Sequence, residues 1–236
     1  MEGLILHCGS ERVTRNDLRH VPTPEPTPTW KPVPHHEVAE LVVNEAKSRG
    51  YEIVGEDYGL NDCGSKMFGV LRFSPKGGRP GMSRALGFRN SHDKSLALGL
   101  TAGISVICCD NMAFGGEVTI HRKHTSGIEI NELVPKAFEK LAYQYVRLEE
   151  TIDGLKLKMV TIDTARVLTV MAAEANAIPS CDILTVLDEF REPTHEEFKE
   201  PTMWSLYNGF TETAKKYSPM RADQCYRSLA KLFGLT

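Results

Sequence analysis

The sequence lacks any long hydrophobic run. No apolar stretch approaches the roughly 20 residues that a helix needs to cross a bilayer. The N-terminal residues MEGLILHCGSER also lack the basic region and the long apolar core of a signal peptide. We therefore expect a cytoplasmic protein without a membrane partner.

Strong chemical motifs are missing as well. The chain contains no glycine-rich phosphate loop, no GxGxxG unit and no GxSxG elbow. Its six cysteines form no CxxC pair and are too sparse for a secreted disulfide framework, so free thiols are expected. The run HRKHT lacks the glutamate of a zinc-binding HExxH helix, and on a strand its two histidines face opposite sides. These absences favour a binding protein over an enzyme. The sequence assigns no metal-ligating residues and leaves any cofactor unknown.

What the sequence does contain is a basic segment in its middle. Residues 64–124 hold nine Lys and Arg against three Asp and Glu, a local charge of +6 in a chain whose net charge is −3. A positive face of this kind suits phosphate. The alternative interpretation is a solvated strand surface balanced by acidic helices.

Composition divides the chain into an arm and one domain. Residues 1–34 include VPTPEPTPTWKPVP, which has six prolines in 14 residues and must run extended. Residues 35–236 are expected to form a single α+β domain, β-rich over 51–125 and helical over 129–234. The predicted architecture is an N-terminal helix, an antiparallel meander of about five strands and a helical C-terminal half.

Short β-type runs and helical periodicity give the predicted elements. The predicted strands cover 51–60, 66–74, 83–90, 99–109 and 116–125. Their short, glycine-rich connections favour antiparallel pairing. Apolar residues at helical spacing predict helices over 35–50, 131–152, 161–178, 180–192, 202–217 and 220–234. Gly154 is expected to end a helix, and Ser180 and Ser218 lie where N-caps belong.

The densest polar stretch is RNSHDKS, which begins at the end of the third predicted strand. Its asparagine, serine and aspartate are natural turn formers whose side chains bond nearby backbone, so a turn is one interpretation. Its arginine, histidine and lysine add cationic groups that a turn does not need, so a ligand site is the other. The candidate ligand-binding residues here are Arg89, Asn90, Ser91, His92, Asp93 and Lys94.

Two further groups of candidate ligand-binding residues follow along the chain. Asp110 and Asn111 end the fourth predicted strand, where a carboxylate and an amide either face a ligand or form a hairpin turn. Arg122, Lys123 and His124 lie in the fifth predicted strand. Together with RNSHDKS they place all the candidates in the basic segment.

The run from Gly87 to Thr125 resembles the hallmark of the phage/plasmid-like protein family, a domain of unknown function from phages, plasmids and prophages. The matching residues are RNSHDK at 89–94, Cys109, Asp110, Asn111, Phe114 and RKHT at 122–125, with Trp204, Tyr207, Asn208 and Thr211 of WSLYNGFTETAK near the C-terminus. The resemblance covers about residues 51–216 and leaves the arm outside. It implies a mobile-element setting, with the host cytoplasm as location if a phage encodes the chain, and it brings no established activity or catalytic residue.

Three hypotheses from different classes follow. The first is an accessory protein that binds nucleic acid, with single-stranded DNA as one candidate, or another phosphate-rich ligand through its basic β-rich face. The helix–meander–helix order also distantly resembles that of single-strand annealing proteins of recombination. Single-stranded DNA requires aromatic platforms, and the candidates are Phe68, Phe73 and Phe88.

The second hypothesis is a non-enzymatic inhibitor of a host defence system that acts through protein contacts of the arm and the acidic helices. The third is a metal-dependent hydrolase or phosphodiesterase that uses His92, Asp93 and Asp110, and it alone calls for a divalent metal. The sequence leaves open a nucleotide, a host protein or a second copy of the chain as partner.

Overall fold

A computed structural model describes residues 11–61, 63–75, 81–106, 112–114, 120–125 and 127–235, of which 112–114, 120–122, 219 and 220 are described by their backbone alone. The elements follow the expected order of a helix, a meander and a helical second half. The predicted α+β class and its architecture are therefore confirmed.

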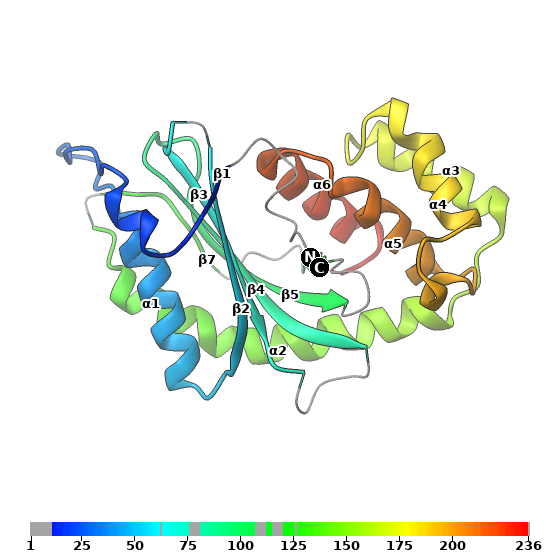
Figure 1. Ribbon diagram of the computed structural model, residues 1–236, viewed down its shortest axis with the longest axis horizontal. Coiled ribbons are helices and arrows are strands. Elements are labelled where there is room, and N and C mark those ends of the chain that lie inside the picture. The colour runs from blue at the N-terminus through cyan, green and yellow to red at the C-terminus, as the bar shows by residue number, and fades with distance from the viewer. Residues whose placement is uncertain are drawn as a thin grey trace.

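An antiparallel sheet forms the centre of the molecule (Figure 1). Its strands are β1 (Glu11–Val13), β2 (Ile53–Leu60), β3 (Lys66–Phe73), β4 (Met82–Ser91), β5 (Leu98–Val106), β6 (Met112–Phe114) and β7 (Ile120–Arg122). The strands β2 to β5 pair in sequence order. Both β6 and β7 pair with β5, against residues 103–105 and 98–100 respectively, and so form one edge in two pieces.

Two strands of three residues each add to the five predicted ones. β1 lies within the expected arm and pairs with β2, with Glu11 opposite Leu60. β6 lies in what the sequence suggests is a connection. Three residues are too few to show the alternation of apolar and polar residues by which a strand is predicted.

The helices are α1 (His35–Ser48), α2 (Ile130–Leu157), α3 (Ile162–Glu174), α4 (Ile183–Arg191), α5 (Met203–Ala214) and α6 (Pro219–Leu232), with 3-10 turns at Asp17–His20, Ser180–Asp182 and Glu196–Phe198. Every predicted helix is present. Within the described part of the chain, none of them is both long and apolar enough to span a membrane.

Two details of the predicted helix boundaries are wrong. Gly154 does not end α2, which continues to Leu157. A helical glycine costs about 1 kcal/mol relative to alanine, and burial of Leu155, which contributes about 1.5–3 kcal/mol, outweighs that cost. Ser180 lies inside a 3-10 turn and caps nothing, whereas Ser218 accepts a hydrogen bond from the Arg221 N–H at 3.4 Å, as an N-cap should.

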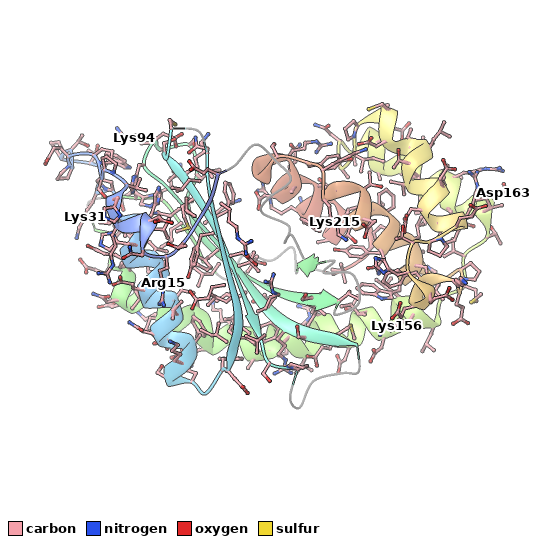
Figure 2. The ribbon with its side chains drawn as sticks, in the orientation of Figure 1. Arg15, Lys31, Lys94, Lys156, Asp163 and Lys215 are labelled. Carbon is pink, nitrogen blue, oxygen red and sulfur yellow. The ribbon has the colours of Figure 1, made fainter. Side chains whose placement is uncertain are left out.

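The helices lie on both sides of the sheet. Figure 1 shows α1 and α2 on one side and α5 and α6 on the other, with α3 and α4 at the outer edge of the helical half. The 28-residue helix α2 contacts α1, β5 and α5, and so connects the two halves. Lys94 and Lys156 lie at opposite ends of the sheet (Figure 2).

The sheet face that packs on α1 and α2 carries the core side chains. The Tyr145 hydroxyl of α2 donates a hydrogen bond to the Ala85 carbonyl of β4 at 2.8 Å. Arg84 lies over the Tyr145 ring, 5.1 Å from its centroid, and pairs with Glu149 at 2.8 Å. Leu71 and Leu86, which lie opposite each other in β3 and β4, are both fully buried. Burial of each such side chain contributes about 1.5–3 kcal/mol.

Gly69 is required on this face because the Phe88 ring occupies the place of a side chain. Gly69 of β3 lies opposite Phe88 of β4, and a Cβ atom on Gly69 would overlap the Phe88 ring. The ring also packs edge-on against Tyr58 of β2, with the centroids 6.0 Å apart. The glycine therefore lets one aromatic ring fill the space above two strands.

We expect Gly69→Ala to lower the free energy of unfolding by about 1–3 kcal/mol, because overpacking forces side chains and backbone to shift. Gly154→Ala is the matched control, since a Cβ atom there meets nothing within 4 Å. It should raise the free energy of unfolding by about 0.5–1 kcal/mol through helix propensity. Urea denaturation measures both, and equal stabilities for Gly69→Ala and the wild type would contradict the packing argument.

Candidate functional site

The polar stretch RNSHDKS is divided by the alternation of side chains along β4. Successive residues of a strand point to opposite faces, so Arg89 and Asn90 lie on different sides of the sheet. Asn90 faces α1 and Arg89 faces α6, as their contacts with His35 and Asp223 show. The candidates of this stretch therefore do not form one site.

Asn90 is the centre of a buried hydrogen-bonded group, here called the histidine network. Its Nδ2 donates to the Val33 carbonyl at 2.7 Å and to His35 Nδ1 at 2.9 Å, while its Oδ1 accepts from His124 Nε2 at 2.6 Å. The Val33 carbonyl also accepts from His92 Nε2 at 2.9 Å. The His35 and His92 rings stack in parallel with their centroids 3.8 Å apart. The network fastens the proline-rich stretch and α1 to the end of the sheet.

These hydrogen bonds require neutral histidines. His35 Nδ1 accepts from Asn90, so its proton is on Nε2, which donates to the Gly64 carbonyl at 3.1 Å. Burial lowers the pKa of His35 to about 3, helped by repulsion from His92. Burial also lowers the pKa of His92, against the opposing effect of the Val33 and Pro22 carbonyls, and lowers that of His124. The three rings thus form a neutral structural group at physiological pH.

The remaining residues of the stretch make a turn. Asp93 Oδ1 accepts from the Ser95 N–H at 3.0 Å, as in an Asx turn. Burial by itself raises the pKa of Asp93, but the hydrogen bonds from Ser95 and the charge of Lys66 prevail and lower it to about 2. The Ser91 hydroxyl accepts from the Leu96 N–H at 3.1 Å. Lys94 has a φ of 65° and lies over the Trp30 ring, 4.7 Å from its centroid.

The other candidates lie apart from this turn. Lys123 is exposed next to the buried His124. Arg122 lies in β7, where its backbone pairs with that of Leu98 in β5. Asp110 and Asn111 lie outside the described residues. Over the part of the chain that the structure describes, no three histidine, cysteine or carboxylate side chains form a group that could hold a metal ion.

Arg89 belongs to a second feature, here called the arginine-glycine face. It is the sheet face directed towards α6, and its defining residues are Arg12, Arg72, Arg89, Gly55, Gly59, Gly87, Gly99 and Gly103. The strands β2 to β5 contain six glycines, and the pairing register places five of them on this face. Glycines inside strands weaken a sheet and often mark the close approach of a ligand or another backbone.

The arginines of this face share carboxylates in two groups. Asp57 is buried, and its two oxygens bind Arg12 at 2.6 Å and Arg72 at 2.7 Å. Asp223 of α6 binds Arg89 at 2.6 Å and Arg227 at 2.7 Å. Each carboxylate is thus matched by two guanidinium groups, and each group keeps one excess positive charge.

Arg89 is only 7% exposed, and its Nε is buried without a hydrogen-bond partner among the described residues. A buried donor without a partner destabilises the fold by about 1–3 kcal/mol, and by more when the donor is charged, as Arg89 is. An anion next to Nε would supply the missing acceptor.

Phe68 is the one candidate aromatic platform that remains accessible. It lies on the arginine-glycine face between Gly59 of β2 and Arg89 of β4, and it is half-buried. Phe73 and Phe88 lie on the opposite face and are buried in the core. The site therefore combines an accessible ring with glycine neighbours and two arginine groups.

Sequence reasoning missed most of this face. Arg12 lies in the expected arm and Asp223 in the last helix, both outside the basic segment. The even spacing of Gly55, Asp57 and Gly59 was the available signal, because residues two apart share a face of a strand. The strand register was needed to place them next to Arg72 and Arg89.

The fold and this face define an α+β protein whose meander lies between two layers of helices. The chain belongs to the family described as domain of unknown function DUF932, whose model matches residues 26–232. The match begins inside the proline-rich stretch, so it is wider than the resemblance over about 51–216 and does not leave the whole arm outside. No curated protein and no solved structure matches the chain closely enough to add a second comparison.

The histidine network predicts a loss of stability in mild acid. The pKa of His35 is about 3 in the folded protein and about 6.5 in the unfolded chain, so the unfolded state takes up the proton as the pH falls through 6.5. The neutral His35 therefore contributes its full stabilisation to the folded state above a pH of about 6.5, and this stabilisation is lost as the pH falls below that value. Between pH of about 7 and about 5, His35 alone should lower the free energy of unfolding by about 2 kcal/mol.

Urea denaturation at the two pH values measures this effect. His35→Gln should be less stable at neutral pH and should lose less stability on acidification than the wild type. His20→Gln, at an exposed position, is the control and should leave the acid loss unchanged. An equal acid loss in His35→Gln and the wild type would show that the network is not the source.

Proposed function

We propose that the protein binds a phosphate-rich ligand, single-stranded DNA above all, across the arginine-glycine face. The observation that carries this proposal is the row of residues Arg12, Gly59, Phe68 and Arg89 on four neighbouring strands. It combines the two elements that single-strand binding requires, namely cationic groups for the backbone and an aromatic ring for a base.

The electrostatic support comes from the excess of guanidinium groups. Neighbouring strands are about 4.8 Å apart, so Arg12 and Arg89 are separated by about 14 Å across the sheet. Arg72 lies between their strands, and its guanidinium lies within 2.9 Å of where a Cβ atom of Gly55 would be. Guanidinium groups bind phosphate in bidentate geometry. The Arg12 and Arg72 side chains are 49% and 26% exposed, so each can turn from the carboxylate they share to a phosphate.

The half-buried Phe68 ring supports a flat ligand such as a nucleic-acid base. Gly59 and Gly87 flank Phe68 and its neighbour Val70 on the adjacent strands. Both glycines are buried and Phe68 is half-buried, so the surface that a base can reach here is the Phe68 ring. A flat ring between small residues suits stacking that tolerates any base sequence.

Of the candidate ligand-binding residues in RNSHDKS, Arg89 is the one that belongs to this proposal. The biological setting is part of the same proposal: an accessory protein of a phage or plasmid that acts in the host cytoplasm. The inhibitor and hydrolase hypotheses stay predictions of the sequence, because none of the contacts described above favours either of them.

We expect the protein to bind single-stranded oligonucleotides at low salt, with an affinity that falls as salt rises through counterion release. Phe68→Leu keeps an apolar side chain but removes the stacking surface, and should weaken binding by about 1 kcal/mol. Arg72→Ala leaves Asp57 paired with Arg12, and should flatten the slope of log affinity against log salt by about 0.7. Fluorescence anisotropy at several salt concentrations measures both effects.

Tyr143→Leu and Arg191→Ala are the matched controls, because these exposed side chains lie off the arginine-glycine face: Tyr143 is on α2, which packs on the opposite face of the sheet, and Arg191 is on α4. Both should bind as the wild type does. The proposal fails if the wild type binds no oligonucleotide at low salt, or if Phe68→Leu and Arg72→Ala behave like their controls.

A further inference from the structure

The exposed hydrophobic side chains are concentrated in one part of the chain. Nine large hydrophobic side chains are exposed among the described residues, and six of them lie between residues 157 and 184. These six are Leu157, Met159, Val167, Val170, Met171 and Leu184. Single exposed apolar residues are normal on a protein surface, whereas a contiguous group marks an interaction site.

Three of the six form a stripe on α3. Val167, Val170 and Met171 are spaced three and four residues apart, so they share one face of the helix. Their exposed fractions are 59%, 44% and 45%. Ala165 and Ala172 are fully buried and face the rest of the protein. The helix is therefore apolar on two sides, and only one of them is covered.

The position of α3 leaves this stripe open. Figure 1 shows α3 and α4 at the outer edge of the helical half, and Figure 2 shows Asp163, at the start of α3, on the same edge. Leu184 of the adjacent helix α4 is 67% exposed. The exposed apolar side chains of α3 and α4 therefore lie in the part of the molecule that is far from the sheet.

The charges around the stripe are self-complementary. Arg166 lies four residues before Val170 and Glu174 four residues after it, about 6 Å along the helix in each direction. Glu174 is exposed, and Arg166 is 55% exposed with one ion pair inside its own helix, to Asp163 at 2.8 Å. An exposed pair of that kind contributes little and leaves the guanidinium available.

We propose that a second copy of the chain binds here, with α3 packed antiparallel against α3 of the partner about a two-fold axis at Val170. This arrangement places Arg166 opposite Glu174 of the partner subunit, and the reverse pair forms by symmetry. The apolar side chains of both stripes lie between these two ion pairs. A two-fold contact uses the same patch on both copies. A patch with opposite charges at equal distances from its centre is therefore self-complementary.

The dimer brings four helices together, namely α3 and α4 of each copy. A contact limited to α3 buries less surface than the roughly 1,200–2,000 Å² of a stable interface. We therefore expect the dimer to form reversibly. The two sheets lie at the far ends of the dimer, because α6 and α5 separate the sheet from α3 in each copy (Figure 1). The inference is independent of ligand binding at the sheet.

The test is the mass of the full chain in solution over a wide range of concentrations, measured by sedimentation velocity. The wild type should shift from monomer to dimer as the concentration rises. Val170→Asp places two carboxylates face to face at the axis and should abolish the dimer. Val146→Asp is the matched control, because Val146 of α2 is exposed to a similar extent, 47%, and it should associate as the wild type does.

Charge reversal tests the antiparallel arrangement itself. Arg166→Glu and Glu174→Arg should each weaken association at low salt, and the double variant should restore it. Thermal melting of each variant verifies that the fold is intact. The proposal is overturned by a wild type that is monomeric at every concentration, by Val170→Asp dimers as stable as the wild type's, or by a double variant that does not regain association.

Discussion

The hydrogen bonds of the Asn90 side chain are the constraint on which the arrangement of the sheet depends. They join the proline-rich stretch at Val33, the first turn of α1 at His35 and the segment after β7 at His124. Because Asn90 is fixed on the α1 side, its neighbour Arg89 must point to the α6 side. One amide therefore holds the end of the sheet together and also directs an arginine to Asp223, which ties the sheet to the helical half.

The same alternation explains what the sequence predicts well and what it does not. The order of helix, meander and helices follows from periodicity, which depends on near neighbours in the chain. RNSHDKS looks like a single cluster in sequence, but a strand places neighbouring residues on opposite sides, so it contributes to a structural network, a turn and a charged face. The tautomers of His35 and His92 depend on the Gly64 and Val33 carbonyls, and no pattern in the sequence brings these groups together.

The two faces of the sheet differ in the side chains they carry. One face buries leucines and aromatic rings against α1 and α2, and a glycine at position 69 leaves room for the Phe88 ring. The other carries five of the six glycines in β2 to β5, so it has fewer side chains to bury. Such a distribution costs stability, since glycine in a strand has no side chain to bury.

The sharing of Asp57 by Arg12 and Arg72 has a kinetic consequence. A buried carboxylate with a single partner would be left bare if that partner moved to another anion, and breaking a buried pair in this way costs about 3–5 kcal/mol. Asp57 keeps one guanidinium while the other is engaged elsewhere. If the face binds an anion as proposed, exchange of that anion avoids a high-energy intermediate, so both capture and release can be fast while the protein stays folded.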